Sequence, residues 1–299
     1  MLTFTTWVGG VVKALRVLEL IRVNLRHLAT FYYEEASNIA VWWAWNIPFQ
    51  LLQVAFSLLL FKYYALAFGG ASPLYGDNFM AFIISGLMVN TYMDCALSVY
   101  YEAVGALYLG RVGLGGVHLS RRDYLQLAGI SPYVFMFARV SWRFLMETVM
   151  FILYFVIGVL FFDFSFSTQG DPALALIIIL LGIAACSGLG LISASMYWIA
   201  GSYRGVEPIS WFIRVAVPLV AGVYIPPEVL PEELRMIGRV LPQTYVISAV
   251  REVMLKGAAL SEVAPSLVVL AVQAAVLVPL GILLLKLSLS LARRRATMY

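Results

Sequence analysis

The sequence has very little charge. Only 12% of its 299 residues are Asp, Glu, Lys or Arg, which is about half the share found in an ordinary soluble domain. Hydrophobic residues make up 62% of the chain, and the mean hydropathy is +0.90. So few charges cannot cover a wet surface, whereas helices in lipid satisfy their own backbone hydrogen bonds. The composition therefore predicts an all-α integral membrane protein and argues against a soluble catalytic domain.

Residues that carry catalytic or metal chemistry are also scarce. Cys95 and Cys186 lie in apolar stretches without Cys-x-x-Cys spacing, so neither a disulfide framework nor a zinc site is expected. His27 and His118 are the only histidines, and they form no His-Glu-x-x-His motif. The sequence contains no Gly-Lys dipeptide, so it has no P-loop for nucleotide phosphates. We therefore expect no enzyme, and no cofactor or metal in this chain.

The apolar residues are grouped into runs long enough to cross a hydrocarbon layer of about 30 Å. An N-terminal segment, residues 1–37, comes first, and within it residues 14–32 show the three-and-four spacing of an amphipathic helix lying at the cytoplasmic membrane interface, closed by Glu34 and Glu35. Residues 38–299 are then predicted to form a domain of six transmembrane helices. The predicted spans are residues 40–61, 79–100, 144–162, 172–198, 206–223 and 265–289.

The positions of Lys and Arg predict the orientation. Most of them fall on one side of the predicted spans, and the two opposite loops, residues 69–78 and 163–171, contain none. Short basic loops are retained in the cytoplasm, so both termini are predicted to be cytoplasmic in a multi-pass protein of the plasma membrane. The net charge of +4 forms no continuous basic face, and no nucleic-acid partner is expected.

Two connections are longer than simple turns. The cytosolic loop 101–132 has a Gly-rich stretch followed by a capping box, from Ser120 to Asp123, that predicts a short helix through Leu127 ending near Gly129. The external connection 224–261 has two helical patterns separated at Leu241–Pro242, with Gly257 as the expected stop. Both patterns are too short and too charged to span, which predicts a re-entrant or surface helical hairpin.

Ionisable residues at membrane depth are candidates for function, because they are costly when they face lipid. Asp94 fits either a wet pathway or an interhelical hydrogen bond, and Asn90 shares its helix face. Glu147 lies four residues after Arg143, which favours a helix-surface ion pair over substrate contact. Packing, snorkelling or a place in the interfacial aromatic belt would equally account for the three polar and aromatic residues of the fifth span: Trp211, Phe212 and Arg214.

The order of these parts resembles that of type-2 ATP-binding cassette (ABC) exporter permeases. The external segment carries the most specific likeness, in Ala-Gly-Val-Tyr-Ile-Pro at 221–226, Leu230-Pro231, Leu-Pro-Gln-Thr-Tyr at 241–245, and Arg251. A second likeness is Tyr-Leu-Gln-Leu at 124–127 with Ser131-Pro132, similar to the family's cytosolic segment before the third helix.

The resemblance implies a permease that works with a second permease copy and two cytosolic ABC subunits, which would bind ATP and Mg²⁺ and drive the export of drugs, lipids or lipid-linked glycans. It implies that a coupling helix docks on the ATPase through Ser120, Arg121, Arg122, Asp123, Tyr124, Leu125, Gln126 and Leu127. Spans two and five would line the route, with Asn90, Asp94, Trp211, Phe212 and Arg214 as pathway candidates. The external hairpin would act as a gate, with Pro226, Pro231, Pro242 and Tyr245 as its candidate residues.

Two other classes fit part of the sequence. An ion-coupled secondary transporter would use Asp94 and Glu147, but it predicts an inverted repeat that the sequence does not show. A membrane-embedded enzyme acting on lipids would need a cluster of Asp, His or Cys residues, and the sequence has no convincing one.

Overall fold

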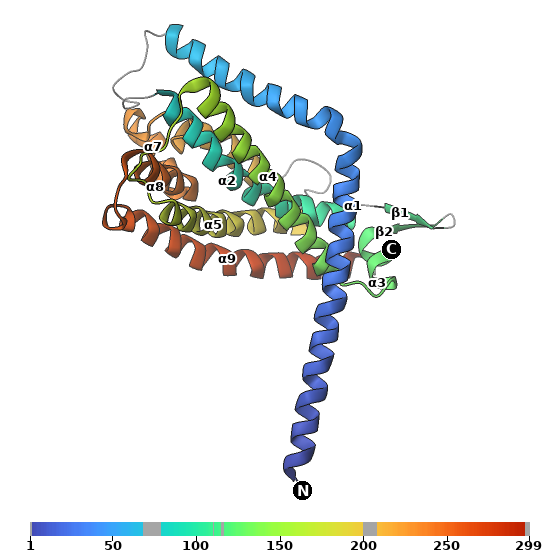
Figure 1. Cartoon of the computed structure of the whole chain (residues 1–299). Coiled ribbons are helices and arrows are strands. Elements are labelled where there is room, and N and C mark those ends of the chain that lie inside the picture. Colours follow the sequence, from blue (N-terminus) through green and yellow to red (C-terminus); the bar gives the residue numbers. More distant parts are fainter. Residues whose placement is uncertain (1, 68–78, 110, 115–116, 200–207, 297–299) are drawn as a thin grey trace. The chain divides into compact units, whose positions relative to one another are not determined.

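The structure is a computed structural model that describes residues 2–67, 79–109, 111–114, 117–199 and 208–296 (Figure 1). Apart from one short hairpin of strands, the described elements are helices. In chain order the elements are α1 (Leu2–Ala67), α2 (Phe79–Tyr108), β1 (Arg111–Leu114), β2 (Val117–Ser120), α3 (Arg121–Leu127), α4 (Pro132–Phe162), α5 (Pro172–Ile199), α6 (Pro208–Val220), the 3₁₀ helix η3 (Pro227–Val229), α7 (Glu232–Val240), α8 (Pro242–Lys256) and α9 (Leu260–Ala296).

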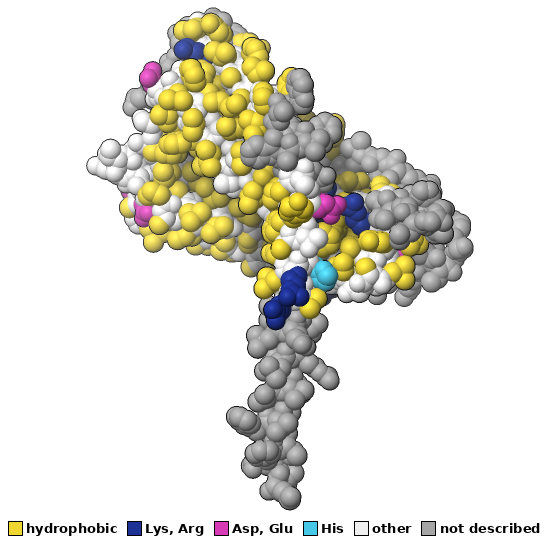
Figure 2. Space-filling model, turned by 45° about the vertical axis from the view of Figure 1, so that its right-hand side comes forward, with side chains coloured by type: hydrophobic (Ala, Val, Ile, Leu, Met, Phe, Trp, Pro, Cys, Tyr) yellow, Lys and Arg dark blue, Asp and Glu magenta, His cyan; other side chains and the backbone are white. Residues whose placement is uncertain are grey.

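Within the described residues, five helical segments are long and apolar enough to cross a membrane. They are Ile47–Tyr64, Phe79–Tyr108, Pro132–Phe162, Pro172–Ile199 and Leu260–Leu291. The predicted starts of the second and fourth spans are confirmed, and the predicted third span, residues 144–162, lies within a helix that begins at Pro132. On the face shown in Figure 2, hydrophobic side chains predominate among the coloured side chains of the described residues. The chain is therefore a multi-pass membrane protein.

The predicted fifth span is shorter in the structure. Of the predicted residues 206–223, 206 and 207 lie outside the described residues, and α6 is a 13-residue helix that ends at Val220. The chain then bends through residues 221–225. Pro208 begins the helix, as expected for a residue tolerated in a first turn.

The chain divides into two compact units, each described here by itself. The first combines Met1–Asn46 with Gly105–Trp142, and the second combines Ile47–Val104 with Arg143–Tyr299. The core of the second unit is apolar, and small residues allow its helices to approach closely. A Cβ on Gly188 of α5 would lie 2.6 Å from backbone of Leu277, and one on Gly281 of α9 would lie 2.7 Å from the Gly188 carbonyl. The α5–α9 pair, side by side in Figure 1, thus packs backbone against backbone.

The two helices predicted for the external connection are present as α7 and α8. Leu241 separates the two helices, and α8 ends at Gly257 in a left-handed conformation with φ of 72°, as the Gly stop predicted. However, α8 is not a surface helix, because Val246, Ile247 and Val253 are fully buried in the core of the second unit.

One local prediction is wrong. Glu34 and Glu35 do not end the N-terminal helix, because α1 runs through both of them. Glu35 instead forms an ion pair with Arg139 of α4, far away in the sequence. The antiparallel pairing of β1 and β2 before the short cytosolic helix was not predicted from the sequence, and in this hairpin Arg111 faces Ser120.

Candidate coupling surface and transport pathway

The short helix α3 begins where the capping box predicted. The Ser120 side chain accepts a hydrogen bond from the Asp123 N–H (3.2 Å), and its hydroxyl donates to the Asp123 carboxylate (2.6 Å). The helix ends before Gly129, which has a φ of 71°. A seven-residue helix is too short to be stable alone in water, so its stability comes from this cap and from the residues beneath it.

An apolar cluster supports α3 from one side. Leu125 is 3% exposed and packs with Leu107 of α2 and Phe135 of α4. Arg121 lies over the Phe135 ring at 5.2 Å, and Arg122 lies over the Tyr108 ring at 5.4 Å. These cation–π contacts hold the basic side chains against the cluster.

The opposite side of α3 is exposed. Leu127 is 76% exposed, and Asp123 and Gln126 are exposed with it. The eight residues predicted to contact the ATPase therefore fall into two sets, in which Leu125 is part of the core and Leu127 is available to a partner.

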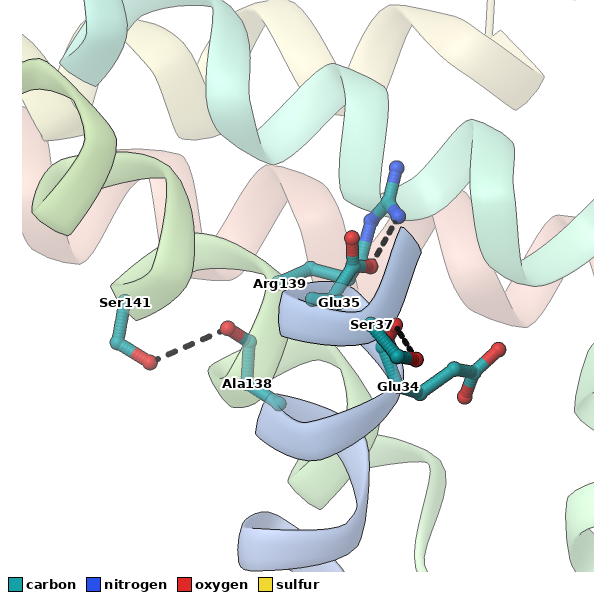
Figure 3. A network of polar contacts seen from close by, with 6 residues as sticks. All are labelled: Glu34, Glu35, Ser37, Ala138, Arg139 and Ser141. Atoms are coloured by element: carbon teal, nitrogen blue, oxygen red, sulfur yellow. Dashed lines mark hydrogen bonds and ion pairs between the residues drawn. The ribbon is translucent and has the colours of Figure 1, made fainter. Parts of the chain in front are cut away.

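The N-terminal helix packs on the same support. Phe31 meets the Phe135 ring edge-on at 5.3 Å, and the Tyr32 hydroxyl lies 2.6 Å from Ser141 Oγ. Figure 3 shows Arg139 of α4 directed toward Glu35 of α1, and Ser141 bonded to the Ala138 carbonyl of its own helix. Within the first unit, α1 thus braces the start of α4, which in turn supports α3.

In the second unit, the charged residues at membrane depth form ion pairs. Asp94 of α2 and Arg214 of α6 are 2.8 Å apart. Arg143 and Glu147 form the predicted pair within α4, at 3.0 Å. Asp94 therefore has a partner on another helix, as the interpretation of an interhelical hydrogen bond requires. Both side chains of the pair remain partly exposed.

The other pathway candidates lie on the same two helices. Asn90 lies one turn from Asp94 on α2 and is half-buried. Trp211 and Phe212 are exposed on α6, whereas Ile213 and Val217 face the core. The α6 helix thus has a buried apolar side and an exposed side that carries two aromatic rings beside Arg214.

At the break between α7 and α8, side chains donate hydrogen bonds to the backbone carbonyls at the end of α7. Three successive carbonyls at the end of α7 accept hydrogen bonds: Gly238 from Thr244 (2.7 Å), Arg239 from the Tyr245 hydroxyl (2.9 Å) and Val240 from Gln273 of α9 (3.0 Å). The Gly238 carbonyl also accepts from the Leu241 N–H at 3.1 Å, and the last carbonyls of a helix need such partners from outside it. Among the candidate gate residues, Pro226 caps η3, Pro231 precedes α7, and Pro242 begins α8.

Arg251 is a central residue that the sequence-based choice of site residues missed. It is 8% exposed and donates to four acceptors, which lie on α2 and on the turn after α6. Burial lowers the pKa of Arg251 to about 9, and the guanidinium remains charged at neutral pH. Its place in the external segment that resembles the exporter permeases was the sequence signal that could have identified it.

The β1–β2 hairpin was also missed, although the sequence carries a signal for it. Gly115 and Gly116 stand between two four-residue runs in which apolar residues alternate, Val112 with Leu114 and Val117 with Leu119. A Gly-Gly pair between alternating runs is typical of tight hairpins.

Long apolar helices, ion pairs at membrane depth and a capped helix break define a multi-pass membrane protein with the parts of a transporter. Residues 120–283, more than half of the chain, match the ABC-2 family transporter protein. The chain belongs to this family and is a permease subunit of an ABC transporter. A search of curated proteins found no match.

Proposed function

We propose that this chain is one half of the membrane channel of an ATP-driven exporter in the plasma membrane. Two copies would enclose the route, and two cytosolic ABC subunits would supply ATP hydrolysis. The observation that carries this proposal is α3, a capped helix with one side fixed on a core and the other side exposed. The family membership supports the same assignment.

Energy coupling would occur at the exposed side of α3. Leu127 supplies an apolar contact, and Asp123 and Gln126 supply polar ones. The cluster beneath α3 would transmit a displacement, because α3, α1 and the start of α4 pack on the same aromatic side chains. Since the sequence has no P-loop, ATP and Mg²⁺ would bind to the partner chain.

The route would be lined by α2 and α6, with six crossings in each copy and both termini in the cytosol. The α6 helix rises about 20 Å at 1.5 Å per residue, which is less than the bilayer thickness. The turn that follows would fill the remaining depth, because Ala221 and Val223 are buried inside protein and such backbone is tolerated when it is sheltered.

The proposed cargo is amphipathic, such as a drug or a lipid. Trp211 and Phe212 offer exposed aromatic surface, and the partly exposed Asp94–Arg214 pair offers charge of both signs. The α7–α8 hairpin would close the outer end. The outward direction is supported by the likeness to exporters.

The test is a pair of leucine variants in the first unit. In permease reconstituted with its ATPase, Leu127→Glu is expected to reduce ATPase copurification and transport by about tenfold or more, because charge at a central contact disrupts a docked interface. Leu109→Glu is the matched control, since Leu109 is also an exposed leucine of this unit but lies outside α3. Equal behaviour of the two variants would exclude docking through α3.

The ion-coupled alternative receives no support from the charged residues. Asp94 and Glu147 each contact an arginine, whereas a proton or cation site needs a carboxylate that can release its partner and bind the ion.

A further inference from the structure

Arg251 of α8 reaches two other segments of the second unit. On α2 it donates to the Phe82 carbonyl (2.7 Å) and to Ser85 Oγ (3.2 Å). On the turn after α6 it donates to the carbonyls of Gly222 (2.6 Å) and Val223 (3.2 Å). The guanidinium also lies 3.5 Å from the centre of the Phe82 ring. One side chain therefore joins the hairpin, a span and the end of a broken helix.

The backbone around the guanidinium is shaped to receive it. A Cβ on Gly86 would lie 2.4 Å from Arg251 Nη2 and 2.8 Å from the Val223 carbonyl, so no larger residue fits there. Gly222 has a φ of 82°, a conformation that favours glycine and turns its carbonyl toward Arg251. The two glycines leave room for the planar guanidinium, whose fork of donors can reach several acceptors at once.

The groups that accept hydrogen bonds from the Arg251 guanidinium are uncharged. Among the residues that the structure describes, no carboxylate forms an ion pair with Arg251, and its hydrogen-bond acceptors are three carbonyls and a hydroxyl. Carbonyls that follow a helix end carry partial negative charge, which favours a cation. Arg251 thus satisfies the backbone that the early end of α6 leaves unpaired, and this backbone in turn satisfies Arg251.

The rest of α8 is bound to the same unit. The Ser167 N–H donates to the Met254 carbonyl at 2.8 Å, and a Cβ on Gly182 of α5 would lie 2.2 Å from the Val246 side chain. Ala249 is 0% exposed. Lifting the hairpin would therefore expose apolar surface and would leave a buried guanidinium without its acceptors, which is strongly unfavourable.

We propose that Arg251 is a positioning residue that locks the α7–α8 hairpin, α2 and the end of α6 into one rigid body. The outer gate then opens by separation of two permease copies, and the hairpin does not lift away within one copy. This inference rests on the proposed function, because it specifies how the proposed gate moves.

The test is the reactivity of an introduced cysteine toward a membrane-impermeant maleimide added from outside, with Cys95 and Cys186 replaced by Ala. The reporter is Ala249→Cys, on the buried side of α8, and the positive control is Val229→Cys, at a position in η3 that is 42% exposed. In the full complex, Val229→Cys is expected to react, and Ala249→Cys to stay protected both at rest and during ATP turnover.

Arg251→Gln is then expected to raise the reaction rate of Ala249→Cys by about tenfold or more, because several charge-assisted hydrogen bonds are lost. Arg251→Lys keeps the charge without the fork and is expected to give a smaller rise. Arg239→Gln is the matched control in the same hairpin, since Arg239 is exposed and its ion-pair partner among the described residues is Glu232 on its own helix, and it is expected to change nothing.

Two results would overturn the proposal. One is ATP-dependent labelling of Ala249→Cys with Arg251 intact, which would mean that the hairpin opens within a copy. The other is an unchanged rate in Arg251→Gln. If Arg251→Gln does not fold, Ser85→Ala removes one acceptor and is expected to raise the rate by about threefold. Labelling of Val229→Cys only from the cytosol would instead show that the proposed topology fails.

Discussion

At the scale of single residues, the Asp94–Arg214 pair joins α2 to α6 at membrane depth. We predict that Asp94→Ala and Arg214→Ala each lower thermal stability in detergent, and that the double variant loses less than the sum. The reason is that each single change leaves an unpaired charge. The coupling should be about 0.5–1 kcal/mol, because both side chains are partly exposed.

The control for this cycle is Glu232 with Arg239, an exposed pair on α7. Its coupling should be smaller, since exposed ion pairs contribute little. Additive effects of Asp94→Ala and Arg214→Ala would show that the contact between α2 and α6 contributes no stability.

Residue partners were predictable only where they are close in sequence. The Arg143–Glu147 pair follows from its spacing of four. Asp94 had two open interpretations, and its partner lies on another helix. The acceptors of Arg251 are mostly backbone carbonyls, which every residue has, so no side-chain pattern identifies them.

At the scale of elements, α3 depends on its cap. Ser120→Ala should destabilise this helix by about 1 kcal/mol, because the Asp123 N–H loses its acceptor. Amide hydrogen exchange of residues 121–127 should become about fivefold faster. Gln126→Ala is the control, since this exposed position carries no cap and Ala favours helix. Equal exchange in the two variants would contradict the role of the cap.

Element boundaries were predictable where Pro or Gly marks them. Pro172, Pro242 and Gly257 stand where helices begin or end, since Pro fits a first turn and Gly a left-handed stop. The end assigned at Glu34 and Glu35 failed because charge alone does not stop a helix, and Glu35 finds a partner on α4.

At the scale of the whole molecule, the second unit depends on close contact between α5 and α9. We predict that Gly188→Ala and Gly281→Ala each lower the unfolding free energy by about 1–3 kcal/mol, because the added Cβ meets backbone that cannot turn away. Thermal unfolding in detergent measures this loss.

The comparison variant is Gly158→Ala, whose Cβ would first meet the flexible end of the Ile84 side chain at 3.1 Å. Its loss should be smaller, because a side chain can shift. Similar losses for Gly158 and Gly188 would mean that backbone contact does not determine the packing of this unit.

The general class of the molecule was predictable from composition, because so few charges leave only lipid as a solvent. The length of the fifth span could not be predicted from the sequence. The bend after Val220 combines Gly222 in a left-handed conformation with hydrogen bonds from Arg251, which comes later in the chain, so the sequence around α6 contains only part of its cause.

Ser120 belongs to two structures at once. It is the last residue of β2, opposite Arg111, and it is also the cap of α3. No spacer residue separates the strand from the helix, so α3 cannot swivel without giving up either a strand pairing or its own first turn. A displacement of α3 would therefore also displace the β1–β2 hairpin, because the two elements share Ser120.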